Sequence, residues 1–132
     1  MKKEALQVIE ERREEFIHIS DQLWDHPELA FQETYSAGLL CGFLEREGFE
    51  VTRGLADIPT AFMGKYGSGR PVIGILGEFD ALSGMSQVSG GLEAKPEKEG
   101  APGHGCGHNL LGAGALAGAV AAKKYIEMKS EA

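Results

Sequence analysis

The sequence has few cysteines, a shortage of basic side chains and no long hydrophobic segment. Its 132 residues include 13 lysines and arginines against 20 aspartates and glutamates, which gives a formal net charge of −7. Nucleic-acid-binding proteins usually present a basic surface, so the acidic balance excludes nucleic acid as the expected partner. The longest apolar run, residues 110–122, is shorter than the roughly 20 residues that a membrane-spanning helix needs. We therefore expect a buried helix there and no membrane anchor.

The two cysteines, Cys41 and Cys106, are far apart, and the charged beginning of the chain does not have the pattern of a secretory signal. Such cysteine usage favours a reduced, cytoplasmic protein. The chain length suits a single domain, because domains typically have about 100–150 residues. Cys41 lies at the edge of an apolar helical stripe, where a lone cysteine is most often a small buried hydrophobic residue.

Two amphipathic helices are predicted in the first part of the chain. Apolar residues recur at helical spacing over residues 2–24, and Pro27 disfavours helix at the residue before it. A second helix is predicted over residues 33–47, ending at Gly48, which suits a left-handed helix cap.

Three strands are predicted next, over residues 49–53, 61–66 and 72–77. The second and third flank the sequence GSGRP, whose glycines suit a tight reversal, so we expect them to form a hairpin. The third, VIGILG, is apolar throughout and is typical of a central strand covered on both faces. Glu78 and Asp80 follow at its carboxyl end, which is where α/β folds bind ligands.

A polar connection over residues 83–103 joins this strand to the last helix, predicted over residues 109–128. Connections of this length are functional or disordered, so we expect its ends to be ordered around a site and its middle to be mobile. Asn109 is a suitable N-cap for the last helix, whose glycines and alanines allow close approach to a sheet.

The densest group of chemically capable side chains lies in PGHGCGHN, where His104, Cys106 and His108 alternate with glycines. A cysteine at a helix N-terminus is favoured as thiolate, and sulfur with imidazole favours zinc or a related transition metal over magnesium or calcium. Three alternatives stay open: a glycine-rich turn without chemistry, a phosphate-binding loop, and a nucleophilic Cys106 activated by a histidine. The phosphate loop is disfavoured because GxGxxG would need glycine at position 108.

The acidic pair can serve the same site. Alternate residues of a strand point the same way, which would place Glu78 and Asp80 over one location. One carboxylate would then contact a metal while the other orients a ligand histidine. The competing interpretation is a solvated strand end.

Four segments together resemble the N-terminal part of the metal-dependent amidohydrolases of the aminoacylase–carboxypeptidase superfamily. They are HPELAFQET, PVIGILGEFDAL, the polar connection that follows, and GHGCGHNLLGAGALAGA. The resemblance covers nearly the whole chain and is most specific in the combination of GEFDAL with GHGCGHN. It implies a three-layer α/β/α, zinc-peptidase-like catalytic domain with two manganese or zinc ions, which hydrolyses N-acyl amino acids or dipeptide-like substrates of the aminobenzoyl-glutamate type.

The resemblance also implies residue roles. Cys106 and His108 match metal ligands of the family, Asp80 matches an orienting aspartate, and Glu78 and His104 are expected to support the site or bind weakly. Related branches carry aspartate at the position of Glu78. The family's catalytic glutamate, its further ligands and its lid and dimerisation domain have no counterpart here, so we expect an N-terminal fragment, residues 1–132, that does not hydrolyse amides alone and tends to self-associate.

Two rival functions remain open from the sequence. One is a non-catalytic metal-binding or interaction protein that keeps this part of the fold without the chemistry. The other is a thiol-dependent hydrolase centred on Cys106.

Overall fold

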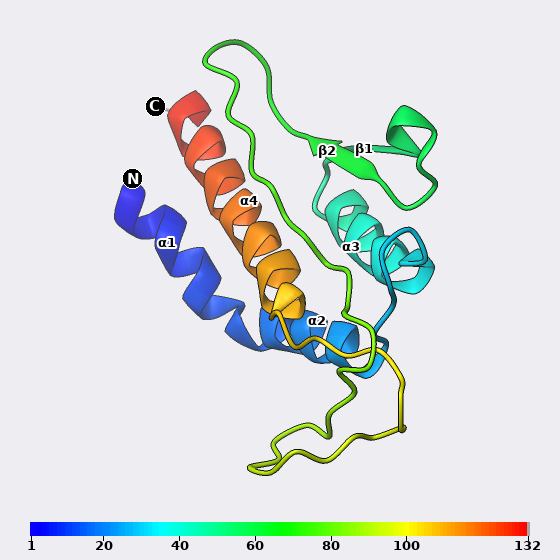
Figure 1. Ribbon diagram of the computed structural model, residues 1–132. Helices are drawn as coiled ribbons and strands as arrows, with labels where there is room; N and C mark the ends of the chain where they lie inside the picture. The colour runs from blue at the N-terminus through cyan, green and yellow to red at the C-terminus, as the bar shows by residue number, and fades with distance from the viewer. Residues whose placement is uncertain (132) are drawn as a thin grey trace.

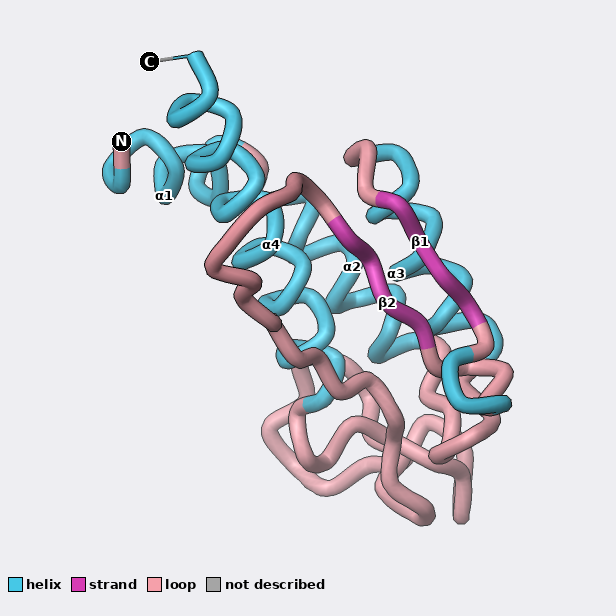
Figure 2. The backbone as a smooth tube through the Cα atoms, turned by 90° about the horizontal axis from the view of Figure 1, so that it is seen from above, coloured by secondary structure: helices cyan, strands magenta, loops and turns pink. Residues whose placement is uncertain are grey.

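The computed structural model describes residues 1–131 as a mixed arrangement of helices with one two-stranded sheet (Figure 1). Three helices, α2, α3 and α4, enclose the hydrophobic core, and the sheet lies beside α3 (Figure 2). The elements in chain order are α1 (Lys2–Glu11), α2 (Arg13–Asp25), α3 (Thr34–Arg46), β1 (Glu50–Arg53), the short helix η1 (Leu55–Asp57), β2 (Phe62–Lys65) and α4 (His108–Glu131). Within residues 1–131, no helix is both long and apolar enough to cross a membrane.

The single helix predicted over residues 2–24 is wrong, because it is broken at Arg12. That residue has φ −109° and ψ 17°, outside the helical range, and it separates α1 from α2. The Arg12 guanidinium contacts Glu47 and lies over the rings of Phe16 and Phe43, at 5.8 and 5.6 Å from their centroids. The bend lets α1 and α2 both pack on α4, which one straight helix would not do.

Helix α3 agrees with the helix predicted over residues 33–47 to within one residue at each end. The free backbone N–H groups at its N-terminus donate hydrogen bonds to a side chain that lies outside the helix. The Glu28 carboxylate accepts hydrogen bonds from the backbone N–H of Tyr35, at 2.9 Å, and from the backbone N–H of Ser36, at 2.8 Å. A carboxylate is well placed at this end because it meets both the free N–H groups and the positive end of the helix dipole.

The strands predicted over residues 49–53 and 61–66 are confirmed as β1 and β2, but the predicted hairpin partner is wrong. Strand β2 pairs antiparallel with β1, in a register that places Glu50 opposite Lys65 and Arg53 opposite Phe62. The strand predicted over residues 72–77 is absent from the described chain. These residues run extended beside α4 without a ladder partner.

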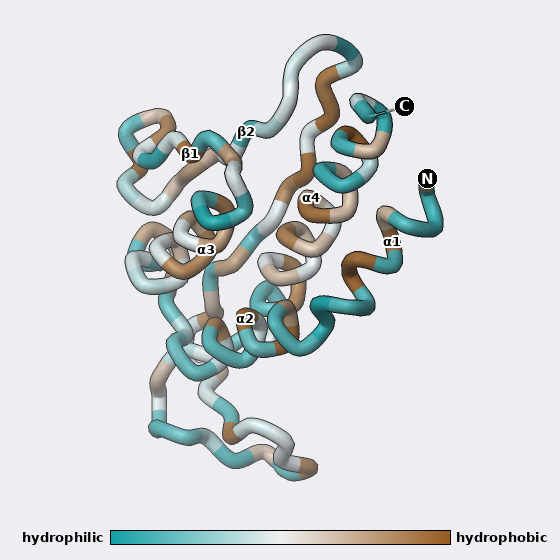
Figure 3. Tube along the Cα trace, turned by 180° about the vertical axis from the view of Figure 1, so that it is seen from behind, coloured by the Kyte–Doolittle hydropathy of each residue, from teal (hydrophilic) through white to brown (hydrophobic). Residues whose placement is uncertain are grey.

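The segment of residues 72–77 is largely exposed and approaches α4 only near Ile75 and Gly77, which corrects the expectation of a central strand buried on both faces. Residues 66–80 make no backbone–backbone hydrogen bond within the described chain. The apolar side chains of Val72, Ile73 and Leu76 are 83%, 80% and 98% exposed, and Figure 3 shows the hydrophobic colouring of this stretch beside α4. A strand needs neighbouring backbone to complete its ladder, and the sequence of the strand itself does not supply it.

One close approach holds this segment against α4. A Cβ atom at Gly77 would lie 2.9 Å from the Cβ of Ala115. We therefore expect Gly77→Ala to lower the free energy of unfolding by about 1–3 kcal/mol, because a methyl group forced into packed space displaces its neighbours. Gly74→Ala is the matched control, since nothing lies within 4 Å of a Cβ there. Urea unfolding followed by far-UV circular dichroism should separate the two variants, and equal midpoints would contradict the contact.

The core is formed by large side chains of α2 and α3 packed on a small-residue face of α4. Leu23 is 0% exposed and Phe43 1%, and the rings of Phe16 and Phe43 lie 5.8 Å apart. The face of α4 contributes the residues Ala113, Leu116, Ala117 and Val120. This packing fixes the beginning of α4, and with it the residues that precede the helix.

Candidate functional site

Two isolated β-bridges hold the residues that follow the acidic pair, and one of them joins these residues to the histidine–cysteine stretch. Ala81 pairs with Leu29, and Leu82 pairs with Gly103 through two backbone hydrogen bonds of 2.9 and 3.0 Å. The chain before residue 81 and the chain after residue 103 are therefore held side by side. Both ends of the connection over residues 83–103 are ordered in this way, while the mobility of its middle stays a prediction.

His108 is the centre of the site, and both of its ring nitrogens face a carboxylate. Nδ1 lies 2.7 Å from Oδ1 of Asp80, and Nε2 lies 3.0 Å from Oε2 of Glu78. The imidazole is nearly buried, with 13% of the side chain exposed, whereas 67% of the Glu78 side chain is exposed. Asp80 thus fixes the ring from the inner side, and Glu78 approaches it from solvent.

The three potential ligands of the HGCGH stretch do not share one environment. Cys106 is exposed, two residues before His108 at the beginning of α4. His104 is 4% exposed, and neither of its ring nitrogens has a hydrogen-bond partner of normal geometry. Burial lowers the pKa of His104 below its ordinary value, an effect that the Leu23 backbone and Asp80 oppose in part.

Asn109 does not cap α4, which corrects the predicted N-cap. The helix begins one residue earlier, at His108, after Gly107 in a left-handed conformation with φ 77°. The Asn109 side chain is buried, and its Nδ2 donates a hydrogen bond of 3.0 Å to Oγ of Ser20. This contact ties the beginning of α4 to α2.

The donor set of the site fits part of a metal centre. A histidine that binds a metal through one ring nitrogen usually donates the N–H of the other to a carboxylate, and Asp80 is placed to accept from Nδ1 of His108. Nε2 is then the nitrogen that would bind a metal, on the side where Glu78 lies 3.0 Å away, and the exposed thiol of Cys106 is two residues away in sequence. Across residues 1–131, however, no three His, Cys, Asp or Glu side chains are grouped so as to hold a metal ion together.

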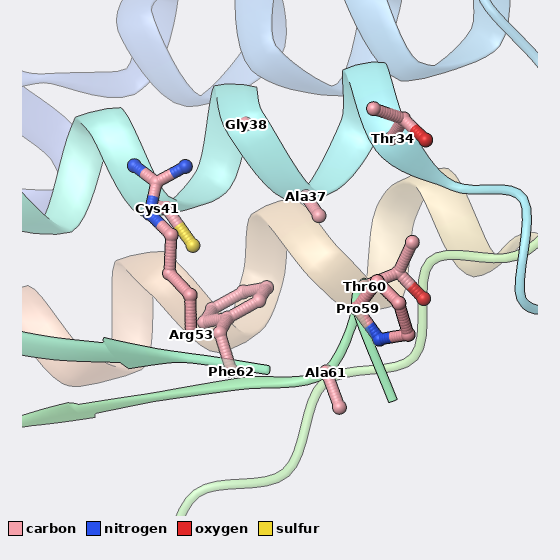
Figure 4. Close-up of a pocket in the computed structure, with 9 residues that line it drawn as sticks. All are labelled: Thr34, Ala37, Gly38, Cys41, Arg53, Pro59, Thr60, Ala61 and Phe62. Atoms are coloured by element: carbon pink, nitrogen blue, oxygen red, sulfur yellow. The ribbon is translucent and has the colours of Figure 1, made fainter. Parts of the chain in front are cut away.

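Two cavities lie outside this centre. One of about 140 Å³ separates α3 from the strands and is lined in part by Cys41, Arg53 and Phe62 (Figure 4). Cys41 is 1% exposed there, which confirms its prediction as a buried residue, and burial raises the pKa of its thiol. The other, an open cavity of about 460 Å³, lies between Trp24, the connection and Gly105.

Comparison with known proteins identifies relatives over most of the chain. No family model matches it. Over 90% of its length, the chain is 50% identical to a subunit of the p-aminobenzoyl-glutamate hydrolase of Escherichia coli strain K12. It is 28% identical to a Homo sapiens Xaa-Arg dipeptidase over 96% of its length. Over 78% of its length it is 31% identical to thermostable carboxypeptidase 1 of Saccharolobus solfataricus.

The chain belongs to the aminoacylase–carboxypeptidase superfamily. It spans only about a quarter of each of these relatives, 25%, 28% and 26% of their lengths. The segments on which the superfamily resemblance rests meet in space, since the bridges join Leu29 to Ala81 and Leu82 to Gly103.

Sequence reasoning missed some residues that support this part of the superfamily fold. Glu28, within HPELAFQET, caps α3 from outside the helix and also accepts a hydrogen bond of 2.7 Å from Oγ of Ser36. Glu33 is buried and accepts a hydrogen bond of 2.8 Å from Oγ1 of Thr60. Their positions in a segment that marks the resemblance were the available signal, but no local pattern shows what either carboxylate contacts.

Proposed function

We propose that this chain supplies part of the three-layer α/β/α catalytic domain of a metal-dependent amidohydrolase. The proposed target is the amide bond of N-acyl amino acids or dipeptide-like molecules of the aminobenzoyl-glutamate type. The names of the relatives support this class, since they include an aminobenzoyl-glutamate hydrolase, a dipeptidase and a carboxypeptidase. The observation that carries the proposal is the 2.7 Å contact between Asp80 and Nδ1 of His108.

Asp80 acts by holding the His108 ring. Its carboxylate accepts a hydrogen bond from Nδ1–H, which fixes the tautomer and makes Nε2 the ring nitrogen whose lone pair would bind a metal. Cys106 is the second proposed ligand, because its thiol is exposed at the beginning of α4. If zinc or manganese were bound by these residues, it would supply Lewis-acid chemistry toward a substrate carbonyl and would lower the pKa of a bound water.

Glu78 and His104 have supporting roles in this proposal. The Glu78 carboxylate lies 3.0 Å from Nε2 of His108, so it occupies the side from which a metal would approach and can move aside or bind it weakly. His104 is buried behind the site and is therefore placed to shape the loop. Two ligands are fewer than the three protein ligands of typical catalytic zinc sites, so we propose that the chain alone does not hydrolyse amides.

The geometry gives less support to a thiol hydrolase centred on Cys106. A nucleophilic cysteine needs an imidazole within hydrogen-bond reach to take its proton. Within residues 1–131, Cys106 makes no side-chain hydrogen bond to a histidine, and both ring nitrogens of His108 face carboxylates. The metal-ligand role therefore accounts better for the arrangement.

Metal analysis of the purified chain tests the proposal. In equilibrium dialysis against zinc or manganese the chain should bind about one ion weakly, since it supplies only two ligands, and Cys106→Ser should bind it far more weakly, because a hydroxyl is a much weaker ligand than a thiolate. Cys41→Ala is the matched control, since Cys41 is buried away from the site; it should bind metal as the unmodified chain does. Equal binding by Cys106→Ser would contradict the proposal, as would amide hydrolysis by the metal-loaded chain without added partners.

A further inference from the structure

The open cavity beside Trp24 is built mostly by the connection over residues 83–103, drawn in yellow-green in Figure 1. Its volume is about 460 Å³, within the range of about 300–1,000 Å³ that small-molecule sites occupy. The apolar part of its lining consists of Trp24, Met85, Ala94 and Pro96. An aromatic side chain among smaller apolar ones is typical of a site for a small molecule.

Trp24 does not contribute to the hydrophobic core. Its side chain is half-buried, and it belongs neither to the core cluster nor to the partly buried residues packed against that cluster. Within residues 1–131, no aromatic ring pairs with the indole. A large aromatic surface that neither fills the core nor stacks on another ring is available to a ligand.

Hydrogen bonds within the connection hold the wall of the cavity in shape. The backbone N–H of Val88 donates to the carbonyl oxygen of Lys95 at 2.9 Å. The Gln87 side chain spans the same gap, since its Nε2 donates to the carbonyl oxygen of Glu93 and its Oε1 accepts from the backbone N–H of Lys95, both at 2.9 Å. The wall is therefore folded by contacts within this chain and does not need a ligand to form.

The cavity shares one wall with the stretch that carries the proposed metal ligands. Gly105 lines the cavity and stands between His104 and Cys106 in the sequence. Met85 packs directly on this glycine, because a Cβ atom at Gly105 would clash with Cε of Met85. A ligand group in the cavity therefore lies next to the residues proposed to bind the metal.

We propose that this cavity binds an aromatic acyl group of the substrate, with the ring stacked on the indole of Trp24. The site deepens the proposed function, on which it rests, by naming the acyl side of the substrate. Stacking on an indole favours a flat aromatic ring over a saturated one of similar size, and the thioether of Met85, which lines the same cavity, makes favourable contacts with aromatic rings. The amide bond of such a substrate points towards Gly105, and so towards Cys106.

The charged residues of the lining do not favour a free anion as the ligand. Lys95 brings one positive charge to the cavity and Glu99 one negative charge, so the lining is neutral in sum. An inorganic or carboxylate anion would gain from the lysine and lose to the glutamate. The large apolar contact that Trp24 offers therefore decides the class of ligand.

Titration of the ¹⁵N-labelled chain with p-aminobenzoyl-glutamate, followed by NMR, tests the site. Trp24 is the one tryptophan of the sequence, so its indole N–H gives a single side-chain signal of this type. This signal and the Gly105 backbone amide should shift together and saturate, with a Kd of about 1–10 mM for a ligand held mainly by one ring. Cyclohexanecarbonyl-glutamate, which has a saturated ring and the same glutamate, should bind roughly tenfold more weakly.

Variants of the lining locate the ring, with the Gly105 amide as the probe. Trp24→Ala should weaken binding by roughly tenfold, whereas Trp24→Phe, which keeps an aromatic ring, should stay within about threefold of the unmodified chain. Ala94→Leu places a larger side chain in the cavity and should also weaken binding. Leu92→Ala is the matched control, since this fully exposed residue of the same connection does not line the cavity; it should bind as the unmodified chain does.

All titrations are carried out in EDTA, which separates this site from the proposed function. Saturable binding in EDTA supports the site whether or not Cys106 proves to be a metal ligand, and metal binding by Cys106→Ser decides the proposed function by itself. Far-UV circular dichroism confirms that each variant is folded. Absence of saturable shifts up to about 20 mM ligand, equal affinity for the saturated ring, or unchanged binding by Trp24→Ala would each overturn the proposal.

Discussion

Replacing Leu23 with alanine is expected to lower the free energy of unfolding by about 2–5 kcal/mol. Leu23 is 0% exposed and belongs to the cluster where α2, α3 and α4 meet. Removing a buried isobutyl group loses its transfer free energy and leaves a cavity that the surrounding side chains only partly fill. Since small domains are stable by about 5–15 kcal/mol, this loss is a large fraction of the total.

Urea unfolding followed by far-UV circular dichroism measures this effect without using the neighbouring Trp24 as the probe. Leu92→Ala is the matched control, because the Leu92 side chain is fully exposed and its removal should change stability by less than about 0.5 kcal/mol. A Leu23→Ala midpoint close to that of the control would show that the core does not depend on this position.

The same substitution links the core to the site. A Cβ atom at Gly112 would lie 3.4 Å from Cδ1 of Leu23, so Leu23 packs directly against the first turns of α4. His108 begins that helix, and Asn109 is tied to Ser20 of α2. Loss of packing at Leu23 should therefore loosen the residues that precede α4 as well as the core.

Local sequence was sufficient to predict the elements whose partners are nearby. Helix α3 has an apolar stripe and ends before Gly48, and β1 and β2 lie within a residue of the predicted strands. Asp80 lies 2.7 Å from Nδ1 of His108, a contact that the expected orienting role needs, while the role itself stays a prediction. The spacing and residue types alone pointed to these features.

Other features depend on contacts between distant residues, and local patterns could not give them. The break at Arg12 goes with its contact to Glu47, 35 residues away. The segment of residues 72–77 has the composition of a strand, but a ladder requires a neighbour, and β2 is already paired with β1. Asn109 has the chemistry of an N-cap, but its side chain donates a hydrogen bond to Ser20 of a different helix.

Glu47→Gln is expected to lower the free energy of unfolding by about 2–3 kcal/mol at pH 7, between the values for exposed and for fully buried ion pairs. Only 14% of the Glu47 side chain is exposed, and it contacts Arg12 at the bend between α1 and α2 and Lys123 of α4 at 3.8 Å. The amide removes the charged partner that Arg12 and Lys123 share, and leaves Arg12 with Glu15 and Lys123 with Glu127. Glu45→Gln is the matched control, because the pair of Glu45 with Arg53 is about half exposed and should contribute at most about 1 kcal/mol.

The effect should also depend on pH in a defined direction. The Arg12 guanidinium holds the pKa of Glu47 below its ordinary value of 4.5, so the folded state favours the carboxylate. A lowered folded-state pKa contributes stability that is present above the unfolded value and is lost as pH falls towards the folded value. Urea midpoints between pH 8 and pH 3 should therefore show a gap between the unmodified chain and Glu47→Gln that is constant above about pH 5.5 and shrinks below pH 4.5. A gap that stayed constant down to pH 3, or widened, would mean that the ionised form of Glu47 does not stabilise the bend.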